Sequence, residues 1–486
     1  MTFSPIYAKI FPVCVSYTGF RPQYIKEEKI MNPKNNRSSF SGKIGFVLSA
    51  AGASVGLGNI WRFPYLAAKY GGGIFLLIYI VLALTFGYTM IVAESALGRM
   101  TRKSPVGAFQ SFGKKKWMSF GGWINAVIPI LIVPYYSVIG GWVIKYLLEY
   151  IRGDGAKLAE DGYFSAFISD GASTELCFVL FCMFTLVIIF AGVRNGVERV
   201  SKLMMPVLVV LSVIIAVYSV TRPGALAGVK YFLVPNPANF SWMTVVTAMG
   251  QMFYSLSIAM GILITFGSYM KKETSIEGST KNVEIFDTAI AIMAGLMIIP
   301  AVFAFSGGDP DTLQAGPALM FITIPKVFAN MGLGTFVGIL FFLLVLFAAV
   351  TSSIALTESA VSTFEDELGW NRRKSTVLVG VIMIALGSLS SLGYGPLANI
   401  RIIGMQFLDF FDFLTNSVMM PVAALMTSLL VSRVIGIDRM EEEILHGEGT
   451  FRRKKIFVLM IKYLCPVFTM IILASSVANA FGWISM

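Results

Sequence analysis

Long apolar runs separated by short polar segments are the main pattern along this chain. Eleven of them are close to or above about 20 residues, the length that a helix needs to cross a hydrocarbon core of roughly 30 Å. Lipid-exposed backbone must satisfy its own hydrogen bonds, and the alternation of barrel strands is absent, so each run predicts a transmembrane helix. The predicted spans are 44–68, 74–97, 121–150, 176–192, 201–220, 242–269, 284–306, 336–364, 376–395, 403–432 and 457–484.

The composition agrees with an all-α membrane protein. Of the 486 residues 56% are hydrophobic and 13% are charged, which excludes a soluble enzyme, a disordered tail protein and a disulfide scaffold. Four cysteines and one histidine make no convincing metal site or disulfide framework. The sequence contains no HExxH motif and no nucleophile with a histidine partner, so we do not expect an enzyme.

The net charge of +11 lies mainly in the loops. The segments after spans 2 and 10 hold six Lys or Arg each, whereas those after spans 3 and 9 hold two and one. Positive loops stay in the cytoplasm, which predicts a cytoplasmic amino terminus, an external carboxyl terminus and an inner (plasma) membrane location. The charge is thus a topology signal in a lipid bilayer, and we expect no nucleic-acid partner.

The organisation of the chain follows from these spans. Residues 1–40 form a cytoplasmic segment, and we expect residues 1–30 to be disordered or untranslated because Met31 offers an alternative start. Residues 41–435 form the core, and residues 436–486 comprise a cytoplasmic loop and span 11.

Spans 1 and 6 are interrupted by glycines and polar residues. Interrupted helices at matching positions of two halves are typical of inverted-repeat transporters with a site near the midplane. Glycine also favours close packing of membrane helices, which is the alternative interpretation. The two halves are spans 1–5 (about 44–220) and spans 6–10 (about 242–432). The interrupting residues are Gly52, Gly56, Gly58, Asn59, Arg62 and Pro64 in span 1, and Ser255, Ser257, Gly261, Thr265 and Gly267 in span 6.

These residues lie in motifs that resemble the neurotransmitter:sodium symporter family, in its bacterial amino-acid branch. The motifs are GASVGLGNIWRFPYLAAKYGGGIFLLIY in span 1, then AESALGR, PYYS, GQMFYSLS and FAAVTSSIALTESAVSTFEDELG in spans 2, 3, 6 and 8. The resemblance runs from about residue 37 to the end, with eleven spans instead of the more common twelve. It implies a five-plus-five inverted repeat that imports an amino acid with sodium by alternating access.

The resemblance implies two sodium sites built from oxygen ligands, as a hard cation prefers. The first comprises Ser54, Asn59, Ser255 and Asp287, completed by an oxygen of the substrate carboxylate. The second comprises Gly52, Val55, Ala348, Thr351 and Ser352. The last three share a face of span 8 at i, i+3 and i+4, although hydroxyls on a helix more often bond a neighbouring helix.

Asp287 stands where many members of the family have asparagine. Its carboxylate supplies a negative charge, so we expect no chloride requirement although Tyr79, Gln251 and Ser255 match chloride-site positions. Protonation of Asp287 after sodium leaves would give proton counter-transport, which is a second hypothesis. The alternative is a solvated aspartate at a span end.

The substrate class follows from Gly56, where monoamine carriers of the family place an aspartate. Without that aspartate the substrate brings its own carboxylate, which would meet the amides of Leu57 and Gly58 at a helix end and the hydroxyl of Tyr136. The ammonium would meet carbonyls near Ala53 and those of Tyr254 and Ser257. The remaining pocket favours a hydrophobic or aromatic amino acid and comprises Ile132, Tyr254, Ser257, Met260, Ser352 and Leu356.

Charged residues inside spans are candidates for gates. Arg62 and Asp412 match the family's extracellular pair, with Asp409 one turn earlier as a rival. The cytoplasmic gate matches Arg37 and Asp366, supported by Phe40 and Tyr269. Glu94 is expected to bond the interrupted part of span 6, and Glu358 has no assigned role.

Two other functions fit a chain of this kind. A sodium-conducting channel would need a continuous polar pore, and a sensor would bind an amino acid without moving it. The sequence leaves the particular amino acid, the sodium stoichiometry and the oligomeric state open.

Overall fold

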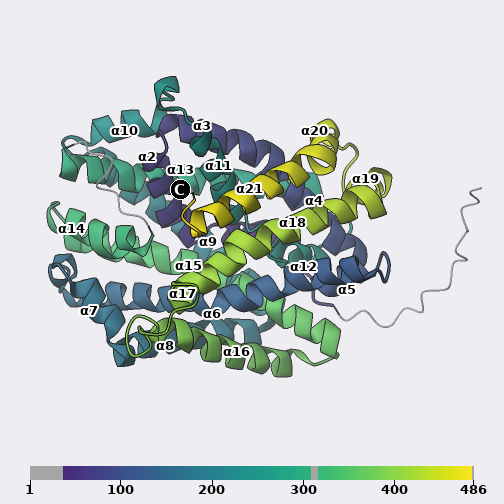
Figure 1. The fold of residues 1–486 in the computed structure, drawn as a ribbon, viewed down its shortest axis with the longest axis horizontal. Helices are drawn as coiled ribbons and strands as arrows, with labels where there is room; N and C mark the ends of the chain where they lie inside the picture. The colour runs from purple at the N-terminus through teal and green to yellow at the C-terminus, as the bar shows by residue number, and fades with distance from the viewer. Residues whose placement is uncertain (1–36, 308–315, 484–486) are drawn as a thin grey trace, which may run out of the picture. The chain divides into compact units, whose positions relative to one another are not determined.

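Helices divided by polar and helix-breaking residues make up the fold (Figure 1). The computed structural model describes residues 37–307 and 316–483, where regular structure is helical apart from two isolated β-bridges. Of the described residues, those from Ser38 onward form one compact unit, and Arg37 belongs to another. Residues 1–30, expected to be disordered or untranslated, lie outside the described part.

The first half of the core follows the predicted order of five spans. Span 1 consists of α1 (Lys43–Ser54), η1 (Gly58–Arg62) and α2 (Phe63–Lys69). The other elements of this half are α3 (Gly73–Leu82), η2 (Ala83–Gly87), α4 (Tyr88–Thr101), α5 (Pro105–Gln110), α6 (Lys116–Arg152), η3 (Lys157–Ala159), α7 (Tyr163–Ser169), α8 (Gly171–Phe190), η4 (Val193–Glu198) and α9 (Arg199–Val220).

The second half begins after α10 (Ala225–Leu233) and η5 (Pro237–Asn239). Span 6 consists of α11 (Trp242–Ser255) and α12 (Ile262–Ser268), separated by residues 256–261. The other elements are α13 (Ile276–Ser306), η7 (Leu319–Thr323), α14 (Ile324–Ala329), α15 (Gly334–Leu368), α16 (Arg372–Leu392), α17 (Phe407–Asp412), η8 (Phe413–Met419), α18 (Met420–Leu429), η9 (Leu430–Ile435), α19 (Ile437–Leu445), α20 (Lys454–Leu459), η10 (Met460–Leu464) and α21 (Cys465–Ala480).

Both predicted breaks are present. Span 1 bends by 53° where Val55, with φ −78° and ψ 91°, leaves the helical conformation. In span 6, Ser257 and Ala259 have φ of 52° and 60°, in the left-handed region that side chains disfavour. Each break leaves backbone amides and carbonyls without partners in their own helix.

The described residues contain nine continuous helices that are long and apolar enough to cross a membrane, and the bent span 1 makes ten. With 14 and 7 residues, α11 and α12 are separately too short. The all-helical membrane fold is confirmed, whereas the count of eleven stays a prediction. The predicted start of span 10 at residue 403 is wrong, because left-handed Ile403 and Gly404 make a turn before the helix starts at Phe407.

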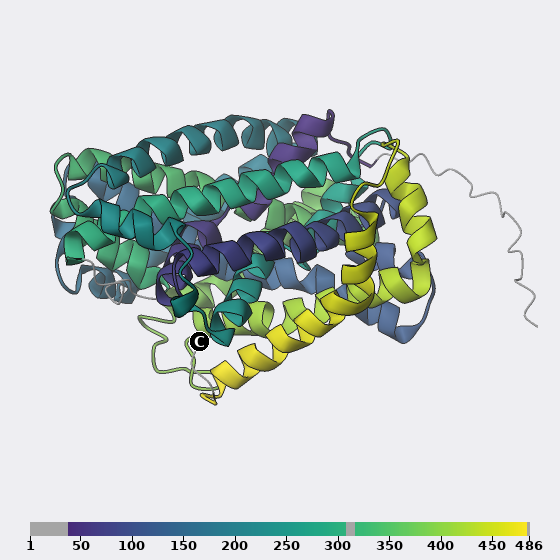
Figure 2. The ribbon, with the colours of Figure 1, turned by 90° about the horizontal axis from the view of Figure 1, so that it is seen from above.

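Long helices lie side by side in both views, and α18 packs along α21 (Figures 1 and 2). Two glycines allow the backbones of α4 and α12 to lie in direct contact. A Cβ on Gly98 would lie 1.9 Å from the Ile264 carbonyl oxygen, and one on Gly267 would lie 2.4 Å from the Ser95 oxygen. Small residues allow membrane helices to approach in this way.

We expect Gly98→Ala to destabilise the purified protein by about 1–3 kcal/mol or more, because the added methyl group would overlap the backbone of α12. Gly250→Ala is the matched control, since a Cβ there meets nothing within 4 Å and the helix gains a better former. Thermal unfolding in detergent measures both variants. Equal melting temperatures for the two would contradict the close packing of α4 and α12.

Candidate functional site

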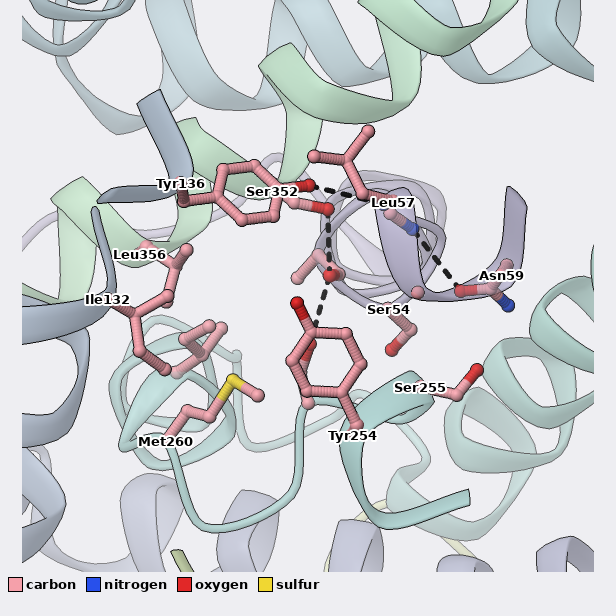
Figure 3. A pocket seen from close by; sticks show the side chains of 15 residues that line it. Ser54, Leu57, Asn59, Ile132, Tyr136, Tyr254, Ser255, Met260, Ser352 and Leu356 are labelled. Atoms are coloured by element: carbon pink, nitrogen blue, oxygen red, sulfur yellow. Dashed lines mark hydrogen bonds between the residues drawn. The ribbon is translucent and has the colours of Figure 1, made fainter. Parts of the chain in front are cut away.

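A cavity lies where the breaks in spans 1 and 6 face α6 and α15 (Figure 3). All of the residues predicted to bind substrate line it, and Asn59 and Ile262 complete the lining. Ile262 was missed by the sequence reasoning, although its place directly after Gly261, at the start of α12, is a usable signal.

One wall of the cavity is polar and follows the break in span 1. The Leu57 amide donates to the Tyr136 hydroxyl (3.3 Å), and the Gly56 amide donates to Asn59 Oδ1 (3.4 Å). A Cβ on Gly56 would lie 2.7 Å from Ser352 Oγ and 3.0 Å from the Tyr136 hydroxyl oxygen. An aspartate at this position would therefore require its neighbours to move.

The opposite end of the cavity is apolar. Ile132, Leu356 and Met260 lie together there, on the far side from Asn59 and Ser255 (Figure 3). A flexible methionine beside branched side chains can adapt to apolar groups of different shape. The cavity thus combines hydrogen-bonding groups at one end with an apolar end.

Asp287 lies at the centre of the first oxygen cluster. Its Oδ1 accepts hydrogen bonds from Asn59 Nδ2 and Ser255 Oγ (both 2.8 Å), and its Oδ2 accepts one from the Tyr79 hydroxyl (2.7 Å). Asp287 is fully buried, which does not fit the alternative of a solvated residue at a span end. Gln251 lies close by and donates from Nε2 to the Gly58 carbonyl (3.0 Å).

A second oxygen cluster lies between α1 and α15. The Ser352 hydroxyl lies 3.2 Å from the carbonyl oxygen of Gly52, 3.1 Å from that of Ala53 and 3.4 Å from that of Val55. The Thr351 hydroxyl donates to the Ala348 carbonyl (3.1 Å).

Every residue predicted for the second sodium site lies in or beside this cluster, since a Cβ on Gly52 would lie 3.1 Å from Thr351 Cβ. Carbonyl and hydroxyl oxygens at these distances are suitable ligands for a hard cation.

The interrupted part of span 6 is held by a side chain from span 2 and a backbone carbonyl from span 1. Glu94, fully buried on α4, accepts a hydrogen bond at Oε1 from the Ala259 amide (2.8 Å), as expected from the sequence. The Ser257 hydroxyl donates to the Ala53 carbonyl (2.9 Å) and so joins the two breaks. These contacts stabilise the left-handed residues of the segment.

Comparison with known proteins identifies the family. The model of the sodium:neurotransmitter symporter family matches residues 37–155 and 165–482, most of the chain. This chain belongs to the sodium:neurotransmitter symporter family.

Relatives and a solved structure agree with this membership. The uncharacterized sodium-dependent transporter YhdH of Bacillus subtilis is 33% identical over 84% of this chain and 91% of its own length. An uncharacterized sodium-dependent transporter of Haemophilus influenzae is 31% identical over 90% of this chain and 98% of its own length. The crystal structure of MhsT in complex with L-phenylalanine is similar with a TM-score of 0.81 at 34% identity, covering 90% of this chain and all of that one.

The predicted extracellular gate residues of this symporter, Arg62, Asp412 and Asp409, line a second cavity. Tyr254 lines both cavities. The Arg62 guanidinium lies 5.3 Å from the centroid of the Tyr254 ring, and among the described residues it makes no ion pair with Asp412 or Asp409. Arg62 and Asp412, the charges of the predicted gate, thus line one cavity without contacting each other.

The two aspartates have different polar partners. Asp412 accepts hydrogen bonds from Asn416 Nδ2 (2.6 Å) and the Tyr135 hydroxyl (3.3 Å), and Asp409 accepts one from the Tyr394 hydroxyl (3.2 Å). The sequence reasoning missed Tyr135, the neighbour of Tyr136 in the PYYS motif. Both carboxylates lie on the cavity that Arg62 also lines, so the choice of Asp412 over Asp409 as its partner stays a prediction.

The predicted supports of the cytoplasmic gate contact each other. The Phe40 amide donates to the Tyr269 carbonyl (3.2 Å), and their rings meet edge to face with centroids 5.9 Å apart. Asp366 accepts a hydrogen bond from the Ser104 amide (2.6 Å). Arg37 belongs to the separate amino-terminal unit, so its predicted pairing with Asp366 stays a prediction.

Glu358, for which the sequence suggested no role, joins three spans of this symporter. Its Oε1 accepts hydrogen bonds from the Tyr269 hydroxyl (2.8 Å) and Arg372 Nη1 (3.0 Å), and a second bond from Arg372 reaches Oε2. Arg372 Nε also donates to the Ile189 carbonyl at the end of α8 (2.8 Å). The buried charge of Glu358 is therefore paired, as burial requires.

We expect Glu94→Ala to weaken substrate binding roughly 10- to 100-fold, because it leaves the buried Ala259 amide without its acceptor, which costs about 1–3 kcal/mol. Glu94→Gln keeps an acceptor oxygen for the Ala259 amide and should lose less. Equilibrium binding to purified protein measures both variants, with circular dichroism as the check on folding. Wild-type affinity in Glu94→Ala would show that the segment holds its shape without this bond.

Proposed function

We propose that this symporter imports a hydrophobic or aromatic amino acid together with two sodium ions, by alternating access. The observation that carries the proposal is the meeting of three features in one cavity: a helix-end amide beside the Tyr136 hydroxyl, an apolar end, and the Asp287 oxygen cluster. L-phenylalanine in MhsT is bound by a similar fold at 34% identity, which supports this substrate class.

The substrate carboxylate would lie between the Leu57 amide and Tyr136, where the start of a helix favours negative charge. From there one of its oxygens can complete the first sodium site, which comprises Ser54, Asn59, Ser255 and Asp287. Ion and amino acid would then each strengthen the binding of the other, which is the physical basis of coupling. Gly56 supports this orientation, because the protein offers no carboxylate of its own there.

Two sodium ions supply enough energy for concentrative uptake. Each ion that enters down roughly 100 mV releases about 2.3 kcal/mol, and a tenfold gradient adds about 1.4 kcal/mol. The sum for two ions is about 7 kcal/mol, which sustains about a 10⁵-fold gradient of a zwitterion. The orientation in the membrane, with the amino terminus in the cytoplasm of an inner or plasma membrane, rests on the positive loops after spans 2 and 10.

Sodium-dependent binding across the twenty amino acids, measured on purified protein, tests the proposal. We expect saturable binding of one or more hydrophobic or aromatic amino acids in sodium and none in potassium. Tyr136→Phe should weaken it about 10-fold or more, because a hydrogen bond to a charged carboxylate is lost. Tyr146→Phe, on the same helix and outside the lining of both cavities, removes a hydroxyl that donates to the Phe321 carbonyl and is the matched control.

Absence of sodium dependence with every amino acid would overturn the assignment. Counterflow in proteoliposomes separates the alternatives, since a channel gives sodium current without substrate saturation and a sensor gives binding without uptake.

We propose that transport needs no chloride, because the Asp287 carboxylate lies beside Tyr79 and Ser255 and supplies the negative charge itself. Wild-type uptake should be equal in chloride and gluconate. Asp287→Asn keeps an oxygen for sodium but removes the charge, so we expect uptake to fall at least about 10-fold and to be restored in part by chloride. Strict chloride dependence of the wild type would contradict the proposal.

A further inference from the structure

Three buried acidic residues follow one another along the inner half of α13. Glu277 and Glu284 are 7% and 2% exposed and Asp287 is fully buried. Spacings of seven and three residues place all three on neighbouring positions of one helix face. That face lies against span 2, because the Tyr79 hydroxyl donates to Asp287 (2.7 Å) and the Tyr88 hydroxyl donates to Glu277 (3.0 Å).

The middle residue of the three, Glu284, has its partner in the connector before span 11, which comprises residues 446–453 between α19 and α20. Arg453 Nη1 lies 3.2 Å from Glu284 Oε2 and 3.4 Å from Oε1, and the guanidinium lies 4.6 Å from the centroid of the Tyr88 ring. The backbone of the connector is fixed at the same place. The amides of Arg452 and Arg453 donate to Glu277 Oε2 and Oε1 at 2.9 and 3.1 Å.

These contacts restrict the position of α13 along and around its own axis. A buried carboxylate is costly unless it is paired and hydrogen bonded, and among the described residues Arg453 alone forms an ion pair with Glu284. Sliding or rotation of α13 against span 2 would separate Glu277 from the Tyr88 hydroxyl, and would separate the Arg453 guanidinium, which Glu284 holds, from the Tyr88 ring. The register in which both contacts form is also the register that brings Asp287, one turn beyond Glu284, to Tyr79 and Asn59.

We infer that Arg453 and Glu284 form a positioning pair for the first sodium site, so that the connector to span 11 contributes to sodium binding without touching the ion. In other proteins, residues that bond to metal ligands and orient them have large effects on the metal site. Their loss commonly costs about 10- to 100-fold in metal affinity. The inference rests on the proposed role of Asp287 as a sodium ligand.

The test removes the ion pair without leaving a lone buried charge. The double variant Glu284→Met/Arg453→Met replaces the pair by apolar side chains of similar size, which proteins often tolerate well. The control is Glu441→Met/Lys454→Met, which removes a neighbouring, more exposed ion pair (2.5 Å) of the same region. A second variant, Arg453→Lys, keeps the charge but not the two-oxygen contact, in case the double variant does not fold.

The readout is the stabilisation of purified protein against heat as sodium replaces potassium, with no amino acid present. We expect the sodium concentration at half effect to rise about 10-fold in the double variant and less in Arg453→Lys. The control should match the wild type. Amino-acid affinity at saturating sodium should be unchanged in the variants, because no cavity residue is altered.

An unchanged sodium midpoint in both the double variant and Arg453→Lys would overturn the inference, even if their melting temperatures fall. If the double variant does not fold, the midpoint of Arg453→Lys alone decides. Failure of the proposed function looks different, since sodium would stabilise the wild type while none of the twenty amino acids binds.

Discussion

The backbone groups freed by the two helix breaks must find partners inside the protein, and this constraint organises the core. In a bilayer an unsatisfied amide or carbonyl costs several kcal/mol, so an interrupted helix is stable only where other side chains or a cavity receive it. Ser352 contacts three carbonyl oxygens at the end of α1, Tyr136 receives the Leu57 amide, and Glu94 receives the Ala259 amide. Two of these side chains, Ser352 and Tyr136, therefore also line the cavity.

The same constraint explains the electrostatics around Asp287. Its carboxylate is fully buried, and its partners are a tyrosine, an asparagine and a serine, all of them neutral. No ion pair to Asp287 exists among the described residues. Three donors compensate the buried charge only in part, because an ionised carboxylate far from water is costly without a counter-charge. A small cation held by the surrounding oxygens would supply that charge, which accounts for the placement of an acidic residue at this depth.

Local patterns predicted much of this molecule. Apolar length located the spans, and the glycine and polar residues near Gly56 and Gly261 located both breaks, because these features act through neighbouring residues. The family motifs predicted the residues that line the cavity, although these residues come from distant segments of the chain. Ile262, the partners of Glu358 and the pairing of Glu284 with Arg453 were not predicted. The last pair is separated by 169 residues, and nothing in the local sequence of either residue points to the other.

The contacts between helices differ in how easily they can break and form again when the helices move. At Gly98 and Gly267, α4 and α12 approach backbone to backbone, and Arg102 donates to the carbonyls of Ser268 (3.0 Å) and Met270 (2.6 Å). Water cannot replace such packing, so these two helices should move as one body. Between α12 and α15 the contacts are side-chain hydrogen bonds, the hydroxyl pair of Thr265 and Ser359 at 3.3 Å and the bond from Tyr269, directly after α12, to Glu358 at 2.8 Å. Water or other side chains can replace such bonds at less cost than backbone packing. An inward path for substrate and ions would therefore separate α12 from α15 and leave α4 attached to α12.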